Sequence, residues 1–159
     1  MTETVRYMDR TREYYRALGY PSDYVWSHFD AVPFANLAKP LSQARIGLVT
    51  TASPPDLDNC DESGKRQVWS GAISPAPANL FTGNLAWDKE STHTDDRASF
   101  LPIEAVQHWT SERVVGGLTA RFHGAPTEYS QRKTMEIDAP QVLARLRADG
   151  ADAALLSPL

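Results

Sequence analysis

The chain has 159 residues, of which 42% are hydrophobic and 23% are charged, and these fractions are typical of a globular domain rather than a disordered chain. Its formal net charge is −4 at pH 7, and its 16 Lys and Arg residues are scattered along the sequence, which argues against binding to nucleic acid. No apolar stretch approaches the roughly 20 residues of a membrane-spanning helix, so no membrane partner is expected either.

The compartment is predicted from the first residues and from the cysteine content. No apolar secretory segment follows Met1, and Cys60 is the only cysteine, lying among acidic neighbours that make its thiolate scarcer. We therefore expect a cytoplasmic protein without an internal disulfide, in which Cys60 is an incidental loop residue.

Residues 1–43 are expected to form a helix and an arm that pack on the rest of the chain. Apolar residues recur at helical spacing over residues 11–18, which predicts a short amphipathic helix that stops at Gly19. We expect the hydrophobic residues of the following polar segment to anchor an arm to the core: Trp26, Phe29, Val32 and Phe34.

Residues 44–159 are expected to form an α/β domain with a mostly parallel sheet and flanking helices, of the Rossmann-like or flavodoxin-like type. The continuous apolar run 45–50 is typical of a strand covered on both faces. Further strands are predicted at 84–88 and 114–119, and a helix is predicted from Leu101 to Trp109. Residues 54–84 are read as a surface excursion in which Val68-Trp69 is a possible edge strand.

The last predicted unit is a helix followed by a strand. Asp138 is a candidate N-cap with Pro140 in the first turn, Gly150 suits the left-handed position past the helix end, and 153–156 form an apolar strand. A crossover helix normally follows such a strand. We therefore expect the domain to be truncated after a core strand, at the sheet edge where ligands bind; the alternative is a natural terminal edge strand.

The richest polar cluster lies in a predicted loop from Arg121 to Arg132. Both arginines are forked donors suited to a carboxylate or a phosphate, and His123 can carry protons near neutral pH. Thr127 and Ser130 are suited to orienting a bound oxyanion. These five residues are the candidate substrate-binding site, and the alternative is a loop whose charged groups are simply solvated.

A metal site is a weaker hypothesis. His93, Asp95 and Asp96 are ordinary ligand types, but their spacing matches no closed zinc pattern, and a loop that caps the next helix explains the aspartates equally well. No glycine-rich phosphate motif follows the strand at 45–50. We predict no metal and no cofactor.

Several segments together resemble the selenoprotein B (component B) family of glycine, sarcosine, betaine and D-proline reductases. The most specific pieces are the 122–127 loop and the helix start at 138–140. The matching stretches are 11–20, 38–41, 44–53, 93–94, 100–102, 121–132 and 136–159. They span nearly all of this chain but only the front part of the family's length, and 54–84 is the poorest match.

The resemblance implies a reductase that cleaves a C–N bond in an amino acid or betaine, with a thiol reductant or other reductase subunits as partners. In the family, the strand resembling 153–158 is followed by a Cys-x-x-Cys or selenocysteine-x-x-Cys pair, then a His and a helix whose N-terminus stabilises the reactive anion. This chain contains no such pair. We hypothesise that Leu159 precedes an unread UGA selenocysteine codon, which leaves the chain inactive as given.

Three functions therefore stay open. The first is a reductase subunit whose catalytic residue follows Leu159, and the second is a small-carboxylate-binding module on the same fold without catalysis. The third is a metal-dependent hydrolase that uses His93, Asp95 and His123. The residues do not choose among glycine, sarcosine, betaine and D-proline as substrates.

Overall fold

The computed structural model describes residues 6–23, 25, 27–33, 35–85, 88–127 and 130–159. The chain forms two compact units, Met1–Phe34 and Ala35–Leu159.

The first unit contains one helix, α1 (Tyr7–Ala17), which begins four residues before the predicted helix and ends as expected ahead of Gly19, whose φ is +84°. None of its residues is buried, and the Tyr15 ring packs edge-on against Tyr14 and Tyr20. Phe29 and Val32 are exposed, so the burial expected of these two is not found. The other two expected anchors, Trp26 and Phe34, lie outside the described residues.

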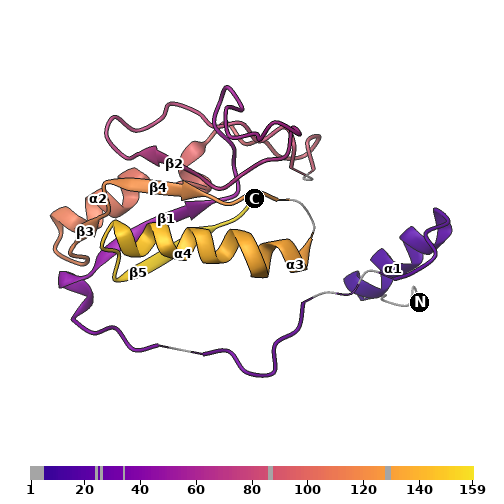
Figure 1. The fold of residues 1–159 in the computed structure, drawn as a ribbon, viewed down its shortest axis with the longest axis horizontal. Helices are drawn as coiled ribbons and strands as arrows, with labels where there is room; N and C mark the ends of the chain where they lie inside the picture. Colours follow the sequence, from indigo (N-terminus) through magenta and orange to yellow (C-terminus); the bar gives the residue numbers. More distant parts are fainter. Residues whose placement is uncertain (1–5, 24, 26, 34, 86–87, 128–129) are drawn as a thin grey trace. The chain divides into compact units, whose positions relative to one another are not determined.

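The second unit contains a five-stranded sheet with helices on its two faces, so the predicted α/β class is confirmed (Figure 1). The strands are β1 (Arg45–Thr50), β2 (Trp69–Ala72), β3 (Gly117–Leu118), β4 (Arg121–Gly124) and β5 (Ala153–Ser157). β1 pairs in parallel with β3, β4 and β5, and β2 pairs antiparallel with β4. The predicted strands at 45–50 and 153–156 and the predicted edge strand at Val68-Trp69 are therefore confirmed.

β3 and β4 form one interrupted strand beside β1. Ile46 lies opposite Leu118, whereas Val49 lies opposite His123, so two extra residues separate the two paired stretches. The expectation that Arg121 begins a loop is therefore wrong, because residues 121–124 form a strand next to the centre of the sheet. The run has only four residues and contains a buried histidine, so its sequence lacks the apolar pattern typical of a strand.

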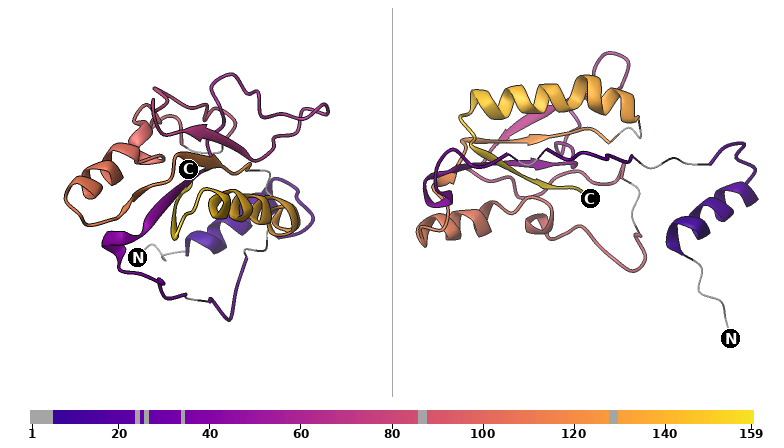
Figure 2. Two further views of the ribbon diagram at one scale, coloured as in Figure 1. Left: turned by 60° about the vertical axis from the view of Figure 1, so that its left-hand side comes forward. Right: turned by 90° about the horizontal axis from the view of Figure 1, so that it is seen from below.

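The two faces of the sheet are covered by different helices (Figure 2). α2 (Ile103–Ser111) packs on the side where the largest cluster of buried hydrophobic residues lies, which includes Leu48, Phe100 and Phe122. α4 (Ala139–Ala148) covers the opposite side through Val142 and Leu146. A Cβ on Gly47 would lie 2.3 Å from the Leu146 side chain, so a glycine in β1 allows this helix to approach closely.

The helix that ends in α4 begins earlier than predicted. α3 (Gln131–Lys133) and a π-helical turn, η3 (Thr134–Asp138), run into α4 without a break, and the Ser130 side chain caps this helix by accepting from the Lys133 N–H. Asp138 is therefore not the N-cap but a buried residue inside the helix. Pro140 has no N–H and its ring crowds the preceding turn, and the wider π-turn accommodates it.

The remaining predictions have mixed outcomes. α2 follows Pro102 as expected, after the short 3-10 helix η2 (Arg97–Ser99); a second such helix, η1 (Leu41–Gln43), precedes β1. Residues 84, 85 and 88 form no strand, contrary to the prediction, and residues 86–87 lie outside the described part. Gly150 has φ +70°, which confirms its position past the helix end. None of the described helices combines the length and the apolar character needed to cross a membrane.

Candidate functional site

The carboxyl ends of the parallel strands β1, β4 and β5 meet at one edge of the sheet, which is where open α/β sheets bind their ligands. The chain continues from β1 into Thr51 and Ser53, and the terminal residues follow β5 at the same edge (Figure 1). The Leu159 N–H donates to the Thr51 hydroxyl at 3.0 Å and joins the two ends. This edge is therefore the first place to look for a site.

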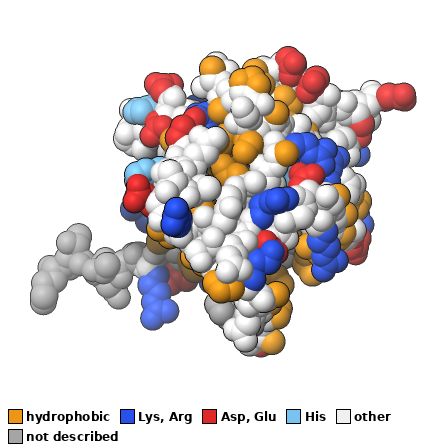
Figure 3. All heavy atoms as spheres, turned by 90° about the vertical axis from the view of Figure 1, so that its left-hand side faces the viewer, with side chains coloured by type: hydrophobic (Ala, Val, Ile, Leu, Met, Phe, Trp, Pro, Cys, Tyr) orange, Lys and Arg blue, Asp and Glu red, His pale blue; other side chains and the backbone are white. Residues whose placement is uncertain are grey.

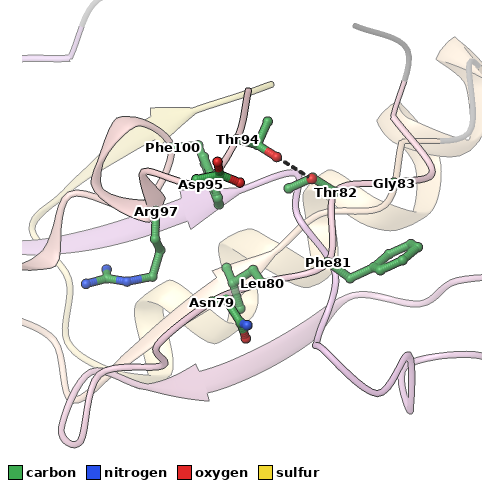
Figure 4. Close-up of a pocket in the computed structure, with 9 residues that line it drawn as sticks. All are labelled: Asn79, Leu80, Phe81, Thr82, Gly83, Thr94, Asp95, Arg97 and Phe100. Atoms are coloured by element: carbon green, nitrogen blue, oxygen red, sulfur yellow. Dashed lines mark hydrogen bonds between the residues drawn. The ribbon is translucent and has the colours of Figure 1, made fainter. Parts of the chain in front are cut away.

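An open pocket of about 410 Å³ lies beyond the end of β1 (Figure 4). Ser53 forms an isolated antiparallel bridge with Phe81, which places one wall of the pocket next to the residues that leave β1. The pocket lies between residues 79–83 and 94–100. It is lined by Asn79, Leu80, Phe81, Thr82, Gly83, Thr94, Asp95, Arg97 and Phe100.

The pocket has hydroxyl groups and charges of both signs. The Thr82 and Thr94 hydroxyls are 2.7 Å apart and hydrogen-bond each other. The Asp95 carboxylate is 93% exposed, and the Lys89 ammonium donates to the Gly83 carbonyl at 3.1 Å. Arg97 is largely covered, donates to the Leu101 carbonyl at 2.8 Å and pairs with Glu104. A small ligand that carries both an ammonium and a carboxylate matches this distribution of charge.

Arg121 and His123, two of the predicted substrate-binding residues, lie away from this pocket. Arg121 begins β4 and holds the Asp149 carboxylate with Nε at 3.1 Å and Nη2 at 2.6 Å. His123 is fully buried, with Nδ1 2.9 Å from the Ser70 hydroxyl and Nε2 3.3 Å from Asp149 Oδ2. Both side chains contact Asp149, the residue that follows α4.

The ionisation of this cluster follows from its contacts. Burial lowers the pKa of His123 below its ordinary 6.5, and the charges of Arg121 and Arg145 act in the same direction, while Asp149 opposes them. The hydrogen bonds from Arg121 lower the pKa of Asp149 below 3.8. At neutral pH the cluster therefore holds a neutral imidazole beside an ionised carboxylate.

Thr127, Ser130 and Arg132 lie at the other end of the helix. Thr127 follows β4 and is half-buried, Ser130 caps α3, and the exposed Arg132 pairs with Glu136 at 2.8 Å. Seventeen residues separate Arg132 from Asp149, and at 1.5 Å rise per residue the two lie roughly 25 Å apart. The structure therefore divides the five predicted residues into two groups, and Arg121 and Arg132 do not share one ligand.

Sequence reasoning missed Ser70, Arg145 and Asp149. The Arg145 guanidinium donates to Ser70 Oγ at 2.8 Å, and Ser70 in turn contacts His123. A serine, a histidine and an aspartate meet here, but the Ser70 hydroxyl is occupied by Arg145, and neither described cavity includes it. We therefore regard the cluster as a structural element and not as a nucleophile.

The metal-dependent alternative finds no ligand set in the described part of the chain. Within residues 6–127 and 130–159, masked positions apart, no group of three or more His, Cys, Asp or Glu side chains is placed to hold a metal ion. His93 and Asp95 are exposed neighbours, whereas His123 is buried on β4. The three residues of the hydrolase hypothesis are not brought together.

A second cavity of about 380 Å³ is an apolar groove between α2 and the edge strand β5. Ile46, Val106 and Val115 form its buried part, and Trp109 and Leu155 are half-exposed at its rim. Hydrophobic side chains also gather between Lys and Arg residues on the face that carries α2 (Figure 3). The groove offers few polar groups for chemistry.

Comparison with protein-family models, with curated proteins and with solved structures found no match to this chain.

Proposed function

We propose that this chain is the amino-terminal α/β part of a cytoplasmic reductase that cleaves a C–N bond in glycine, sarcosine, betaine or a D-proline-like substrate. The reacting thiol or selenol would follow β5. A thiol reductant or further reductase subunits would close the catalytic cycle, as in the family that the sequence resembles.

One observation carries the proposal. β5 lies parallel to β1, and Leu159, two residues past the end of β5, donates to the Thr51 hydroxyl. Two residues further along, Ser53 forms a bridge with Phe81, which lines the open pocket. A nucleophile that follows β5 would therefore enter the edge at which open α/β sheets bind ligands. Asp95 lines the pocket, and Lys89, which is not itself a lining residue, donates to the carbonyl of the lining residue Gly83. Opposite charges in and next to the pocket suit an ammonium group and a carboxylate on one small molecule.

The decisive experiment is to read the codon after Leu159 and the frame beyond it. The proposal requires a UGA or a cysteine codon, with a second Cys and a His close behind. The extended protein, supplied with a dithiol and any further subunits encoded beside it, should then release ammonia or an amine from glycine, sarcosine or betaine, or open the ring of D-proline. A variant with the reacting residue replaced by serine is the control and should release none.

Two results would contradict the proposal. A UAA or UAG codon, or a frame without a nearby Cys and His, removes the reacting group. Binding of a substrate to the extended protein without dithiol-dependent turnover favours the second candidate, a small-carboxylate-binding module, which the same pocket supports equally well.

A further inference from the structure

We infer that Ser70, Arg121, His123, Arg145 and Asp149, here called the His123 cluster, form a pH-sensitive clamp: it ties β2 and the end of α4 to β4 while His123 is neutral, and it loosens when His123 is protonated. The inference rests on the geometry of the cluster and does not depend on the proposed function.

The hydrogen bonds run in one direction while His123 is neutral. Arg145 Nη1 donates to Ser70 Oγ at 2.8 Å, so the Ser70 hydroxyl is directed to donate to His123 Nδ1 at 2.9 Å. The remaining ring proton then lies on Nε2, 3.3 Å from Asp149, a contact whose angle falls short of a hydrogen bond. While the ring is neutral, the Ser70 hydroxyl accepts from Arg145 and donates its own proton to His123 Nδ1.

Protonation of His123 changes this order. Nδ1 becomes a donor, so the Ser70 hydroxyl loses its acceptor and faces two donors, the imidazolium and Arg145. The charged groups facing the ring are Arg121 on its own strand, and Arg145 and Asp149 on the α4 side; Ser70 of β2 and Val49 of β1 are uncharged. The imidazolium would then share the Asp149 carboxylate with Arg121 and would add a charge of the same sign as Arg145, which also acts on the ring; burying this extra cation is unfavourable.

The clamp has its largest expected effect on β2. This strand has four residues, lies at the edge of the sheet and pairs only with β4 among the described strands. The bond from Arg145 to Ser70 ties β2 to α4 across the sheet face. β1 lies between its neighbours and contains none of the clamp residues, so it provides an internal reference.

Hydrogen–deuterium exchange tests the inference on the chain as it stands. The experiment compares amide exchange of residues 69–72 with that of residues 45–50 from above pH 6.5 down to just above pH 3.8, where Asp149 stays ionised. After correction for the intrinsic rate, exchange of β2 should rise about fivefold, as expected for the loss of one hydrogen bond, while β1 changes little. The histidine ring resonances of His123, followed by NMR, should titrate over the same pH range.

Three variants separate the clamp from general acid effects. His123→Gln should remove the rise in β2 exchange, and the matched control His108→Gln, at an exposed site on α2, should retain it. Arg145→Met removes a cation that opposes protonation and should shift the midpoint to higher pH. Exchange of β2 that is independent of pH, or an unchanged rise in His123→Gln, would overturn the inference. If His123→Gln does not fold, the wild type alone decides. The inference is overturned if the pH midpoint of the His123 ring titration differs from the pH midpoint of β2 exchange.

Discussion

The His123 cluster and the pocket beyond β1 contain similar side chains but use them differently. In the cluster, Asp149 is 10% exposed, is held by two arginine atoms and lies against a buried histidine. In the pocket, Asp95 is 93% exposed, and its carboxylate lies 3.7 Å from Nδ1 of the exposed His93. The same carboxylate chemistry is thus structural at one end of the sheet and open to a ligand at the other.

The difference teaches that residue type alone does not identify a site. Arg121 and His123 were predicted to bind substrate because forked donors and imidazoles are common in sites. In the structure they stabilise the packing of β2, β4 and α4. The open groups lie instead at Thr94 and Asp95, in a loop that the sequence analysis assigned to helix capping.

The largest expected effect concerns Gly124, at the border between the two regions. A Cβ at this position would lie 1.8 Å from Trp69 Nε1, which donates to the Ala52 carbonyl at 3.1 Å and so links β2 to the residues after β1. Gly124→Ala should lower the free energy of unfolding by about 3 kcal/mol, measured by urea denaturation. The double variant Gly124→Ala/Trp69→Leu should lose clearly less unfolding free energy than the two single variants lose together. Strictly additive losses would show that contact with Trp69 does not cause the destabilisation by Gly124→Ala.

Asp149→Asn should lower the free energy of unfolding by about 2 kcal/mol, because the charged hydrogen bonds with Arg121 and the contact with His123 are weakened. Glu136→Gln is the matched control, since its exposed pair with Arg132 should contribute no more than about 0.5 kcal/mol. Equal effects of the two substitutions in urea denaturation would contradict the contrast between a closed cluster and an open surface.

The pH dependence of Asp149→Asn sharpens this contrast. Because the pKa of Asp149 is lowered in the folded chain, the contribution of its carboxylate is present above its ordinary 3.8 and is lost as the pH falls through the folded value. The difference in unfolding free energy between wild type and Asp149→Asn should therefore shrink below pH 3.8. His123 affects the unfolding free energy at a higher pH than Asp149 does. Because its pKa is lowered in the folded chain, the wild type loses stability as the pH falls below 6.5. A difference that stays constant in acid denaturation series would exclude the Asp149 assignment.

In the pocket, Thr94→Val should cost about 1 kcal/mol of unfolding free energy, because the hydrogen bond between the Thr94 hydroxyl and the buried Thr82 hydroxyl is lost. Thr92→Val is the comparison at an exposed position, where the hydroxyl donates to the Asp88 carbonyl. Thermal denaturation of both variants measures the difference. A neutral Thr94→Val would show that the hydroxyl pair does not hold residues 82 and 94 together.

The smallest expected effect on stability is that of Asp95→Asn, within about 0.5 kcal/mol, because the side chain is exposed. Its effect should be on binding: affinity for a zwitterion such as glycine or betaine should fall by up to about fivefold, as measured by calorimetry. Asp58→Asn, an exposed acidic residue outside the pocket, should leave binding unchanged. An equal loss in both variants would point to net charge rather than to the pocket.

Much of the fold could be predicted from local patterns. The apolar run at 45–50, the stop at Gly150 and the strand after it reflect backbone and burial preferences that act over a few residues. The errors occur where a distant partner overrides the local pattern. In the strand of residues 121–124 the buried histidine is hydrogen-bonded to the distant Ser70 and lies against the distant Asp149. Asp138 lies inside a helix because a π-turn accommodates Pro140.

By itself, the sequence determined the α/β class, the central buried strand and the edge of the sheet at which a ligand is expected, since periodicity and turn residues encode these features locally. Only the tertiary structure decided which polar residues meet. Ser70 and Asp149 lie far from His123 along the chain and reach it through the register of β2 on β4 and the packing of α4. Such contacts depend on long-range pairing geometry, which no local pattern specifies.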